Sequence, residues 1–551
     1  MTNLFEDNDF PYDNLPDDFK QTAETHWIRP HQISKVVNRQ LTPPGKNVKP
    51  VFINQDLSTF DINQGTVGDC WFLGSIPLVL NNKEIIDKVL CRDENLNGFE
   101  EGKYDGKFVF QFYYHDEWVK VEIDDRLPCR LYSGKYYVPR ATAISDDVEE
   151  MEATDEKNCE YWVPLLEKAY AKFKGGYKNI ESGNSWEAFA NLMGSVGQSI
   201  SVSKMLEKLG SVSASKLARL TDSDHGKLFS HLLHLNDTGA LMTCSYQARD
   251  YLQHNSLGPA KIDRDGNATV YGVFSGHCYT LLGFYQAFGD KLLVKLYNPH
   301  GQSECTLAGL SDNSDIWKNN PEETKRLKHR LGDDGAFFMT IQDWVKLFSK
   351  VNVSYRRKEF MTEKEFENNQ YYFESFKEKN IQMKKGESKP RTYSERQTLD
   401  SLEFEVDDNL LQSHENNAAK MLIAYKIKDI RLDQLSQANS ISGFIVDKYD
   451  ETHQRWKYLD HTANVAEATY LHFTINDAGK YRVVPFAYFT LKQDVEGYCT
   501  VWIKNEKEAK DHVDPIDKKR DALELKLKLK MDELKDLKEE IGEIEDQIGK
   551  L

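Results

Sequence analysis

Cys70 stands immediately before the longest apolar run of the chain, Trp71 to Leu80. This run has about half of the ~20 residues that a membrane-spanning helix needs, so it belongs in a globular core. We expect Cys70 to begin a helix, where the helix dipole and a neighbouring imidazolium lower the pKa of a thiol. The Gln64 amide and the backbone N–H of Cys70 can then donate hydrogen bonds to a developing oxyanion.

Two downstream segments supply partners for such a thiol. Ser275-Gly-His-Cys-Tyr279 lies inside a strand-like run, and Tyr297-Asn-Pro-His-Gly301 ends the next one. On adjacent strands, an asparagine amide can orient a histidine ring. We expect Asn298 to hold Nδ1–H of His277, so that Nε2 faces Cys70. Alone, each residue is better explained as an inert thiol or a structural histidine; the three segments together favour a nucleophile, a general base and an orienting amide.

These motifs resemble those of the calpain family, which carries Gln-Gly-x-x-Gly-Asp-Cys-Trp, Gly-His-x-Tyr and Asn-Pro-Trp-Gly. This chain has QGTVGDCW, GHCY and NPHG, and FEDNDFP, WIRP, EWVKVEIDDRLP and LLEKAYAKF also match over residues 5–350. The resemblance implies a papain-like cysteine protease core in two subdomains. Residues 61–195 would carry Cys70 and Gln64, and residues 196–350 would carry His277 and Asn298, after an N-terminal arm at 1–60.

The remainder of the chain predicts further domains, as a length of 551 residues requires. We interpret 351–395 as a linker and 396–506 as an antiparallel β-sandwich, because short strand-like segments follow one another there. Its AGKYRVVP resembles the C2-like domain of calpains. Residues 515–551 show a heptad pattern that favours a coiled coil over a lone amphipathic helix. The expected class is α+β. The two heptad seams are Leu527, Leu534, Ile541 and Ile548, and Leu523, Leu537, Ile544 and Leu551.

One departure from the family concerns catalysis. The calpain motif has tryptophan where this chain has His300. The resemblance implies that the indole shields the His–Asn hydrogen bond from water, so a smaller polar ring predicts reduced activity. His300→Trp is expected to raise the turnover rate.

The resemblance also implies calcium as a cofactor, bound in the protease core. A first site would use Asp61 and Glu167. A second would use Glu304, Asp312 and Asp334, with Ala336 in place of a further acid. Losing that carboxylate is expected to weaken the second site. An EF-hand is excluded around Gly266, because such a loop would begin with Lys261 and end with Gly272.

Composition excludes several other classes. The net charge of −17 argues against a nucleic-acid partner. The eight cysteines lack the spacing of structural zinc sites and predict free thiols. The first residues, MTNLFEDNDF, have no apolar signal segment, so we expect a cytoplasmic protein.

The leading hypothesis is a calcium-regulated cysteine endopeptidase that makes limited cuts in protein substrates. The alternative is a protease-derived scaffold, which assembles partners through the sandwich and the coiled coil. Self-association through the coiled coil and membrane contact through the sandwich are further possibilities. Transglutaminase-like acyl transfer also uses Cys-Trp with histidine, but it pairs the histidine with aspartate rather than with the asparagine found at Asn298.

Overall fold

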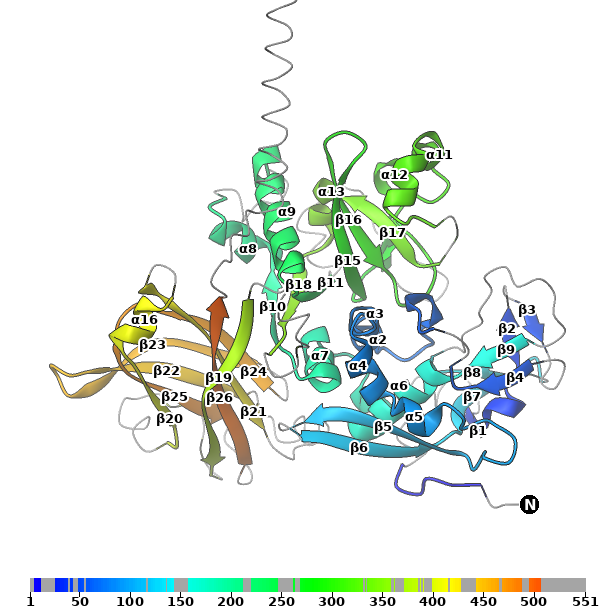
Figure 1. Ribbon diagram of the computed structural model, residues 1–551, viewed down its shortest axis with the longest axis horizontal. Helices are drawn as coiled ribbons and strands as arrows, with labels where there is room; N and C mark the ends of the chain where they lie inside the picture. Colours follow the sequence, from blue (N-terminus) through cyan, green and yellow to red (C-terminus); the bar gives the residue numbers. More distant parts are fainter. Residues whose placement is uncertain are drawn as a thin grey trace, which may run out of the picture. The chain divides into compact units, whose positions relative to one another are not determined.

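The computed structural model consists of helices and β-sheets (Figure 1), and the three largest clusters of buried apolar side chains among the described residues follow one another along the chain. Residues 10–193 supply most of the first core, residues 202–353 the second and residues 381–503 the third. No helix in the described ranges is long and apolar enough to cross a membrane. The predicted coiled coil at 515–551 lies outside those ranges. The structure describes residues 4–10, 25–37, 40–42, 48–53, 56–114, 117–134, 136–142, 157–211, 220–245, 261–262, 268–330, 332, 334–357, 361, 371–384, 387, 390, 399–414, 417–427, 442–464, 468–487 and 495–506.

Short helices and one hairpin form the first part. The helix predicted at 71–80 is present in two pieces, because Pro77 lacks an N–H and its ring would collide with the carbonyl of the preceding turn. Apolar residues at helical spacing predict a helix at 161–174, and strand-like segments predict strands at 108–113 and 118–123; the structure confirms all three. The elements are α2 (Cys70–Leu73), α3 (Ile76–Val79), α4 (Lys83–Val89), α5 (Arg92–Asn95), β5 (Lys107–Tyr114), β6 (Glu117–Asp124), α6 (Trp162–Phe173) and α7 (Ser185–Met193).

Much of the segment expected to be an N-terminal arm pairs with strands of this first part. β1 (Thr25–Ile28) is antiparallel to β7 (Leu127–Tyr132), which also pairs with β8 (Tyr136–Pro139). β4 (Val48–Val51) runs parallel to β9 (Lys157–Glu160). Residues 25–28 and 48–51 are thus built into the same body as the predicted first subdomain. β2 (Lys35–Val37) and β3 (Gln40–Thr42) form a separate pair.

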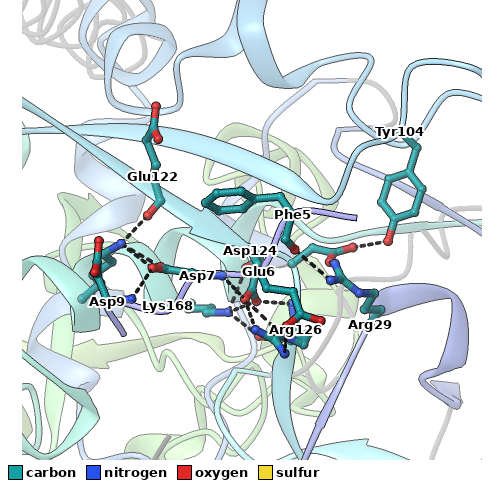
Figure 2. Close-up of polar contacts among 12 residues, drawn as sticks. Phe5, Glu6, Asp7, Asp9, Arg29, Tyr104, Glu122, Asp124, Arg126 and Lys168 are labelled. Carbon is teal, nitrogen blue, oxygen red and sulfur yellow. Dashed lines mark hydrogen bonds and ion pairs between the residues drawn. The ribbon is translucent and has the colours of Figure 1, made fainter. Parts of the chain in front are cut away.

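A network of charges holds residues 4–10 against α6 and β6 (Figure 2). Lys172 donates to both carboxylate oxygens of Asp7, at 2.8 and 2.7 Å, and the Asp7 N–H donates to Asp124 at 2.8 Å. Lys168 is fully buried and donates to Asp124 Oδ1, the Asp124 carbonyl and the Arg126 carbonyl at 2.7, 2.8 and 2.6 Å. A buried ammonium needs such partners to offset the loss of its hydration.

A six-stranded antiparallel sheet forms the second part, with helices packed on it. Its strand order is β10-β18-β11-β15-β16-β17. The sequence predicts strands at 271–284 and 292–297, and a strand and a helix over 337–347. The structure confirms the strand at 292–297 and the strand and helix over 337–347, but it divides the segment 271–284 into two strands, at 273–274 and from 278 onward. The strands are β10 (Val196–Ser201), β11 (Leu241–Ser245), β15 (Cys278–Ala287), β16 (Lys291–Tyr297), β17 (Ala336–Thr340) and β18 (Lys350–Tyr355). The helices are α8 (Val202–Lys208), α9 (Asp222–Asp237), α11 (Asp315–Asn319), α12 (Pro321–Arg326) and α13 (Ile341–Leu347), and the short strands β12 (Lys261–Ile262), β13 (Ala268–Val270) and β14 (Val273–Phe274) form a separate small sheet.

Two four-stranded sheets follow, and both contribute side chains to the third core. Residues 371–383, expected to lie in a linker, form a strand of the first sheet, so the sheet region begins earlier than residue 396. One sheet contains β19 (Tyr371–Met383), β26 (Val495–Glu506), β21 (Ala419–Ile427) and β24 (Ala468–Ile475). The other contains β20 (Leu402–Val406), β25 (Gly479–Ala487), β22 (Ser442–Asp450) and β23 (Arg455–Asn464), and α16 (Asp408–Gln412) follows β20.

Candidate active site

Close backbone packing holds the loop that precedes Cys70. A Cβ built on Gly65 would lie 1.2 Å from the carbonyl oxygen of Ala141, so only glycine fits there. The next residue, Thr66, donates its N–H and its hydroxyl to the Arg140 carbonyl, at 2.8 and 2.7 Å. The helix α2 then begins at Cys70, as the sequence predicts.

Aromatic contacts fix the direction of α2. The Trp71 indole donates to the Ile180 carbonyl at 2.8 Å. The Phe72 ring is stacked on Tyr170 of α6, with centroids 3.9 Å apart and planes at 4°. Through the stacked rings, α2 packs directly against α6, the helix that also contains Lys168.

The Cys70 thiol is buried, with only 8% of the residue exposed. Burial raises the pKa of this thiol, and the neighbouring Cys278 thiol raises it further, while the Cys278 backbone N–H acts in the opposite direction. The expectation of a lowered pKa is therefore wrong for this conformation. The helix α2 has only four residues, and no cation is among the groups that act on the thiol in the described part of the chain, so desolvation prevails.

His277 and Asn298 are paired, as predicted, but through the other ring nitrogen. His277 Nε2 lies 2.8 Å from Asn298 Oδ1. The Asn298 amide donates its N–H groups to the carbonyls of Gln302 at 2.6 Å and Ser303 at 3.3 Å, which fixes its oxygen toward His277. An amide oxygen only accepts, so Nε2 carries the proton and Nδ1 is left as the base. The expectation that Asn298 would hold Nδ1 is wrong.

His300 covers the face of the His277 ring. The two ring centroids are 4.1 Å apart and the planes lie at 18°. The His300 backbone N–H donates to Asn298 Oδ1 at 3.1 Å, so this oxygen accepts from both histidines. Burial lowers the pKa of His277 well below its usual value, and the charge on His300 lowers it further, while the hydrogen bond to Asn298 raises it.

The strand that follows His277 crosses the nucleophile helix. Thr280 Oγ1 donates to the Gly74 carbonyl at 2.5 Å, and the Cys278 thiol lies 3.1 Å from the Ser185 hydroxyl. The Cys278 thiol is therefore close enough to raise the pKa of the Cys70 thiol. Within the described residues, Cys70 and His277 themselves are not joined by a hydrogen bond.

Gln64 is buried, but its donors are already engaged. Its Nε2 donates to the Val67 carbonyl at 2.7 Å and to Asp69 Oδ1 at 3.3 Å, while its Oε1 has no hydrogen-bond partner. Its backbone N–H donates to the Pro299 carbonyl at 2.8 Å, which joins the loop before Cys70 to the loop after Asn298. The Gln64 side-chain amide is thus turned to protein acceptors, and its predicted part in an oxyanion hole stays a prediction.

The two acids expected at a first calcium site are separately engaged. Asp61 accepts the Ser58 N–H at 2.8 Å and the Trp162 indole N–H at 3.3 Å. Glu167 accepts the N–H and the hydroxyl of Thr142, at 3.0 and 2.6 Å. Among the described residues, no group of three or more histidine, cysteine, aspartate or glutamate side chains could hold a metal ion.

The acids expected at a second site act on one another. Glu304 accepts the Asp312 N–H at 2.9 Å. Burial first, and then the charges of Glu304 and Asp334, raise the pKa of Asp312 to about 7. Asp312 Oδ1 is buried without a hydrogen-bond partner. The missing family acid is Ala336, whose N–H donates to Asp334 at 2.9 Å.

Sequence reasoning missed a buried pair of acids, Asp69 and Glu167, of which Asp69 directly precedes Cys70. Asp69 is completely buried, and its pKa is raised well above the usual value by burial and then by the charge of Glu167. Burial likewise raises the pKa of Glu167 to about 7. The available signal was an acid directly before the nucleophile and another inside the apolar helix WVPLLEKAYAKF.

Comparison with known proteins shows the family to which the chain belongs. The family of calpain family cysteine proteases matches residues 5–355. Mouse calpain-9 is 30% identical over 356 residues, which cover 64% of this chain and 42% of calpain-9. A calpain of Schistosoma mansoni is 30% identical over 359 residues (64% and 39%), and Calpain-A of Drosophila melanogaster is 28% identical over 374 residues (65% and 37%). The matches thus span less than half the length of these relatives.

The match covers both halves of the site, from the Cys70 helix to the strand before Asn298. The matched part of the chain contains both helices and sheets, as the expected α+β class requires. The chain therefore belongs to the calpain family of cysteine proteases.

Proposed function

We propose that the chain is a cysteine endopeptidase that makes limited cuts in protein substrates, with Cys70 as nucleophile and His277 as general base. The observation that carries this proposal is Asn298, whose donors and acceptor are all engaged. Such an amide fixes the ring of His277 and leaves its Nδ1 lone pair for the proton of a thiol.

In the proposed reaction, Cys70 transfers its proton to His277 Nδ1 and the thiolate attacks the scissile carbonyl carbon. The Cys70 N–H and Gln64 Nε2 donate to the oxyanion. His277 then protonates the leaving amine, and water that it deprotonates hydrolyses the thioester. Because Gln64 Nε2 donates to Val67 at rest, a rearrangement of this loop has to precede the chemistry.

Calcium is the proposed regulator, and the second acidic group fits it better than the first. Glu304, Asp312 and Asp334 would hold the ion only after moving together, because in the present conformation no group of three or more such side chains among the described residues could hold a metal ion. The charge of the ion would then stabilise these mutually repelling carboxylates. The buried Oδ1 of Asp312 supports this assignment, because it accepts no hydrogen bond and its ion-pair partner His329 Nε2 lies 3.6 Å away. The engaged oxygens of Asp61 and Glu167 do not fit a calcium site in the present conformation.

The test is cleavage of an unfolded protein across a calcium titration, with Cys70→Ala as the blank. Calcium-dependent cleavage that Cys70→Ala abolishes supports the enzyme and its switch. Cleavage indifferent to calcium keeps the enzyme and removes the switch. Asp312→Asn should weaken calcium binding at least about tenfold by calorimetry, whereas Asp315→Asn, at an exposed carboxylate on α11, should leave it unchanged.

A scaffold that assembles partners is the second candidate. The buried thiol, which no hydrogen bond joins to His277, and the engaged donors of Gln64 favour it. In that case the two sheets after residue 371, which we propose form a C2-like sandwich, and the coiled coil at 515–551 would provide the contacts. No cleavage at any calcium concentration, and no labelling of Cys70 by a thiol reagent, would support this candidate.

A further inference from the structure

Two buried polar atoms face each other in the second acidic group without forming a hydrogen bond. His329 Nε2 and Asp312 Oδ1 lie 3.6 Å apart, and their side chains are 2% and 7% exposed. Neither atom has a hydrogen-bond partner in the described part of the chain. Such buried atoms are rare, because each one loses its hydration without compensation, so this pair points to a ligand that belongs between them.

Aromatic packing fixes the imidazole ring of His329. The ring is stacked on the Trp317 indole, with centroids 3.8 Å apart and planes at 20°, and the ring of Phe338 meets it at 5.9 Å and 67°. The indole N–H in turn lies 3.2 and 3.1 Å from the carbonyls of Leu310 and Ser311, which accept from it. Packing therefore holds His329 Nε2 in place without a hydrogen bond to this atom.

Backbone contacts fix the Asp312 carboxylate. Its Oδ2 accepts the Gly332 N–H at 3.3 Å, and the Asp312 N–H donates to Glu304 Oε2 at 2.9 Å. The remaining oxygen, Oδ1, faces His329. Both atoms of the pair are thus set by groups on other sides of them.

The charge around the pair favours a cation. Glu304 and Asp334 lie close enough to act on Asp312 with their negative charge. Two cations act on the same group, the Lys295 ammonium and the Arg330 guanidinium, which lies 3.8 Å from Asp334. When ionised, the three carboxylates outnumber these two cations, and buried carboxylates are stabilised by pairing or by a metal ion.

The separation of the two atoms fits zinc. Zinc binds a histidine nitrogen or a carboxylate oxygen at about 2.1 Å, so an ion between atoms 3.6 Å apart would make an angle of about 118°, close to the tetrahedral value of about 109°. A water molecule about 2.9 Å from both atoms would make an angle of about 77°, which is too sharp for two good hydrogen bonds. Calcium takes oxygen ligands at about 2.3–2.6 Å, and an imidazole nitrogen does not suit it.

We propose that Asp312 Oδ1 and His329 Nε2 bind a zinc ion, and that zinc at this place competes with calcium for Asp312. No group of three such side chains among the described residues could hold a metal ion, so water, or Glu304 after moving, would complete the coordination. The zinc site is independent of the proposed function, and only the competition with calcium rests on it. Zinc would then raise the calcium concentration that the proposed protease needs.

The experiment titrates zinc chloride into metal-free, full-length protein by calorimetry. Every protein carries Cys70→Ala, so that zinc bound to this thiol does not contribute. His329→Phe removes the nitrogen and keeps an aromatic ring, and Asp312→Asn removes the carboxylate charge. His453→Gln is the matched control, because His453 lies 2.9 Å from Asp450 in an exposed pair of the same kind. Thermal melts verify the folding of each variant.

We expect His329→Phe and Asp312→Asn each to weaken zinc binding at least about tenfold, and His453→Gln to leave it unchanged. Saturating calcium should weaken zinc binding by a similar factor in the protein with Cys70→Ala alone. X-ray absorption at the zinc edge should show nitrogen and oxygen neighbours at about 2.1 Å and no sulfur at about 2.3 Å.

Zinc affinity that is equal in His329→Phe and in the protein with Cys70→Ala alone would overturn the site, as would zinc bound through sulfur. If His329→Phe does not fold, the same comparison with Asp312→Asn decides. Zinc binding that His329→Phe weakens but calcium leaves unchanged would overturn the competition. Because Cys70 is absent from every protein, these results are separate from the cleavage assay that tests the protease.

Discussion

Replacing Lys168 by methionine and Asp124 by asparagine would remove opposite halves of one buried ion pair (Figure 2). The two halves have different remaining partners. After Lys168→Met, the Asp124 carboxylate still accepts from the Asp7 N–H, the Arg126 N–H and the Arg126 guanidinium. After Asp124→Asn, the buried Lys168 ammonium keeps backbone carbonyls and loses its direct carboxylate partner.

The structure therefore predicts unequal costs. Asp124→Asn leaves a buried charge without its counterion, which costs about 3–5 kcal/mol. Lys168→Met leaves two carbonyl oxygens without a donor but no uncompensated charge, which costs about 1–3 kcal/mol. Burial already lowers the pKa of Lys168 to about 8, so the ammonium depends on its partners more than the carboxylate does.

Hydrogen exchange in peptides of α6 and β6 measures the local opening free energy. Exchange should accelerate roughly 100- to 4,000-fold in Asp124→Asn and roughly 5- to 150-fold in Lys168→Met. Lys120 lies in the same strand β6, and Lys120→Met removes its exposed ion pair with Glu94 of α5. This control should change the hydrogen-exchange rate less than about fivefold. A Lys168→Met variant that opens as readily as Asp124→Asn would refute the assignment of the cost to the uncompensated ammonium.

Three further predictions concern the site. Asn298→Ala should lower kcat about 10- to 100-fold with little change in KM, because His277 loses the acceptor that orients it; an equal rise in KM would contradict this. Gly335→Ala should lower the melting temperature and kcat together, since the residue has φ of +82° and a Cβ would lie 2.7 Å from the backbone carbonyl oxygen of Asn298. Its cost is about 1–2 kcal/mol. The folded-state pKa of Glu167 is raised from 4.5 to about 7, so its contribution to stability is present below pH 4.5 and is lost as pH rises toward 7. Denaturant titrations between these pH values should show that loss, and Glu167→Gln should reduce it, while Asp69, whose pKa burial also raises, keeps the remainder.

Local patterns in the sequence were enough to predict several elements. Helical spacing predicts α6, and the apolar segments 108–113 and 118–123 predict the hairpin β5–β6, because local periodicity reports which face is buried. The motifs also predict that His277 and Asn298 pair, since both stand at ends of adjacent strands.

Features set by tertiary packing were not predictable in this way. Which nitrogen of His277 meets Asn298 depends on the ring rotamer before β15, and the raised pKa of Cys70 depends on how deeply α2 is buried. The pairing of β1 with β7 joins residues far apart in the chain, and no local pattern at residues 25–28 encodes its partner. The strand β19 lies in a charged stretch whose composition suggests a linker.

The crossing of β15 over α2 also orders events during synthesis. The hydrogen bond from Thr280 to Gly74 joins residues 206 positions apart. At about 5–20 residues per second, a ribosome needs roughly 10–40 s to make that intervening stretch. During that interval the emerging chain carries Cys70 without His277. If these residues act as proposed, a nascent molecule cannot attack neighbouring polypeptides before its own second half has been made.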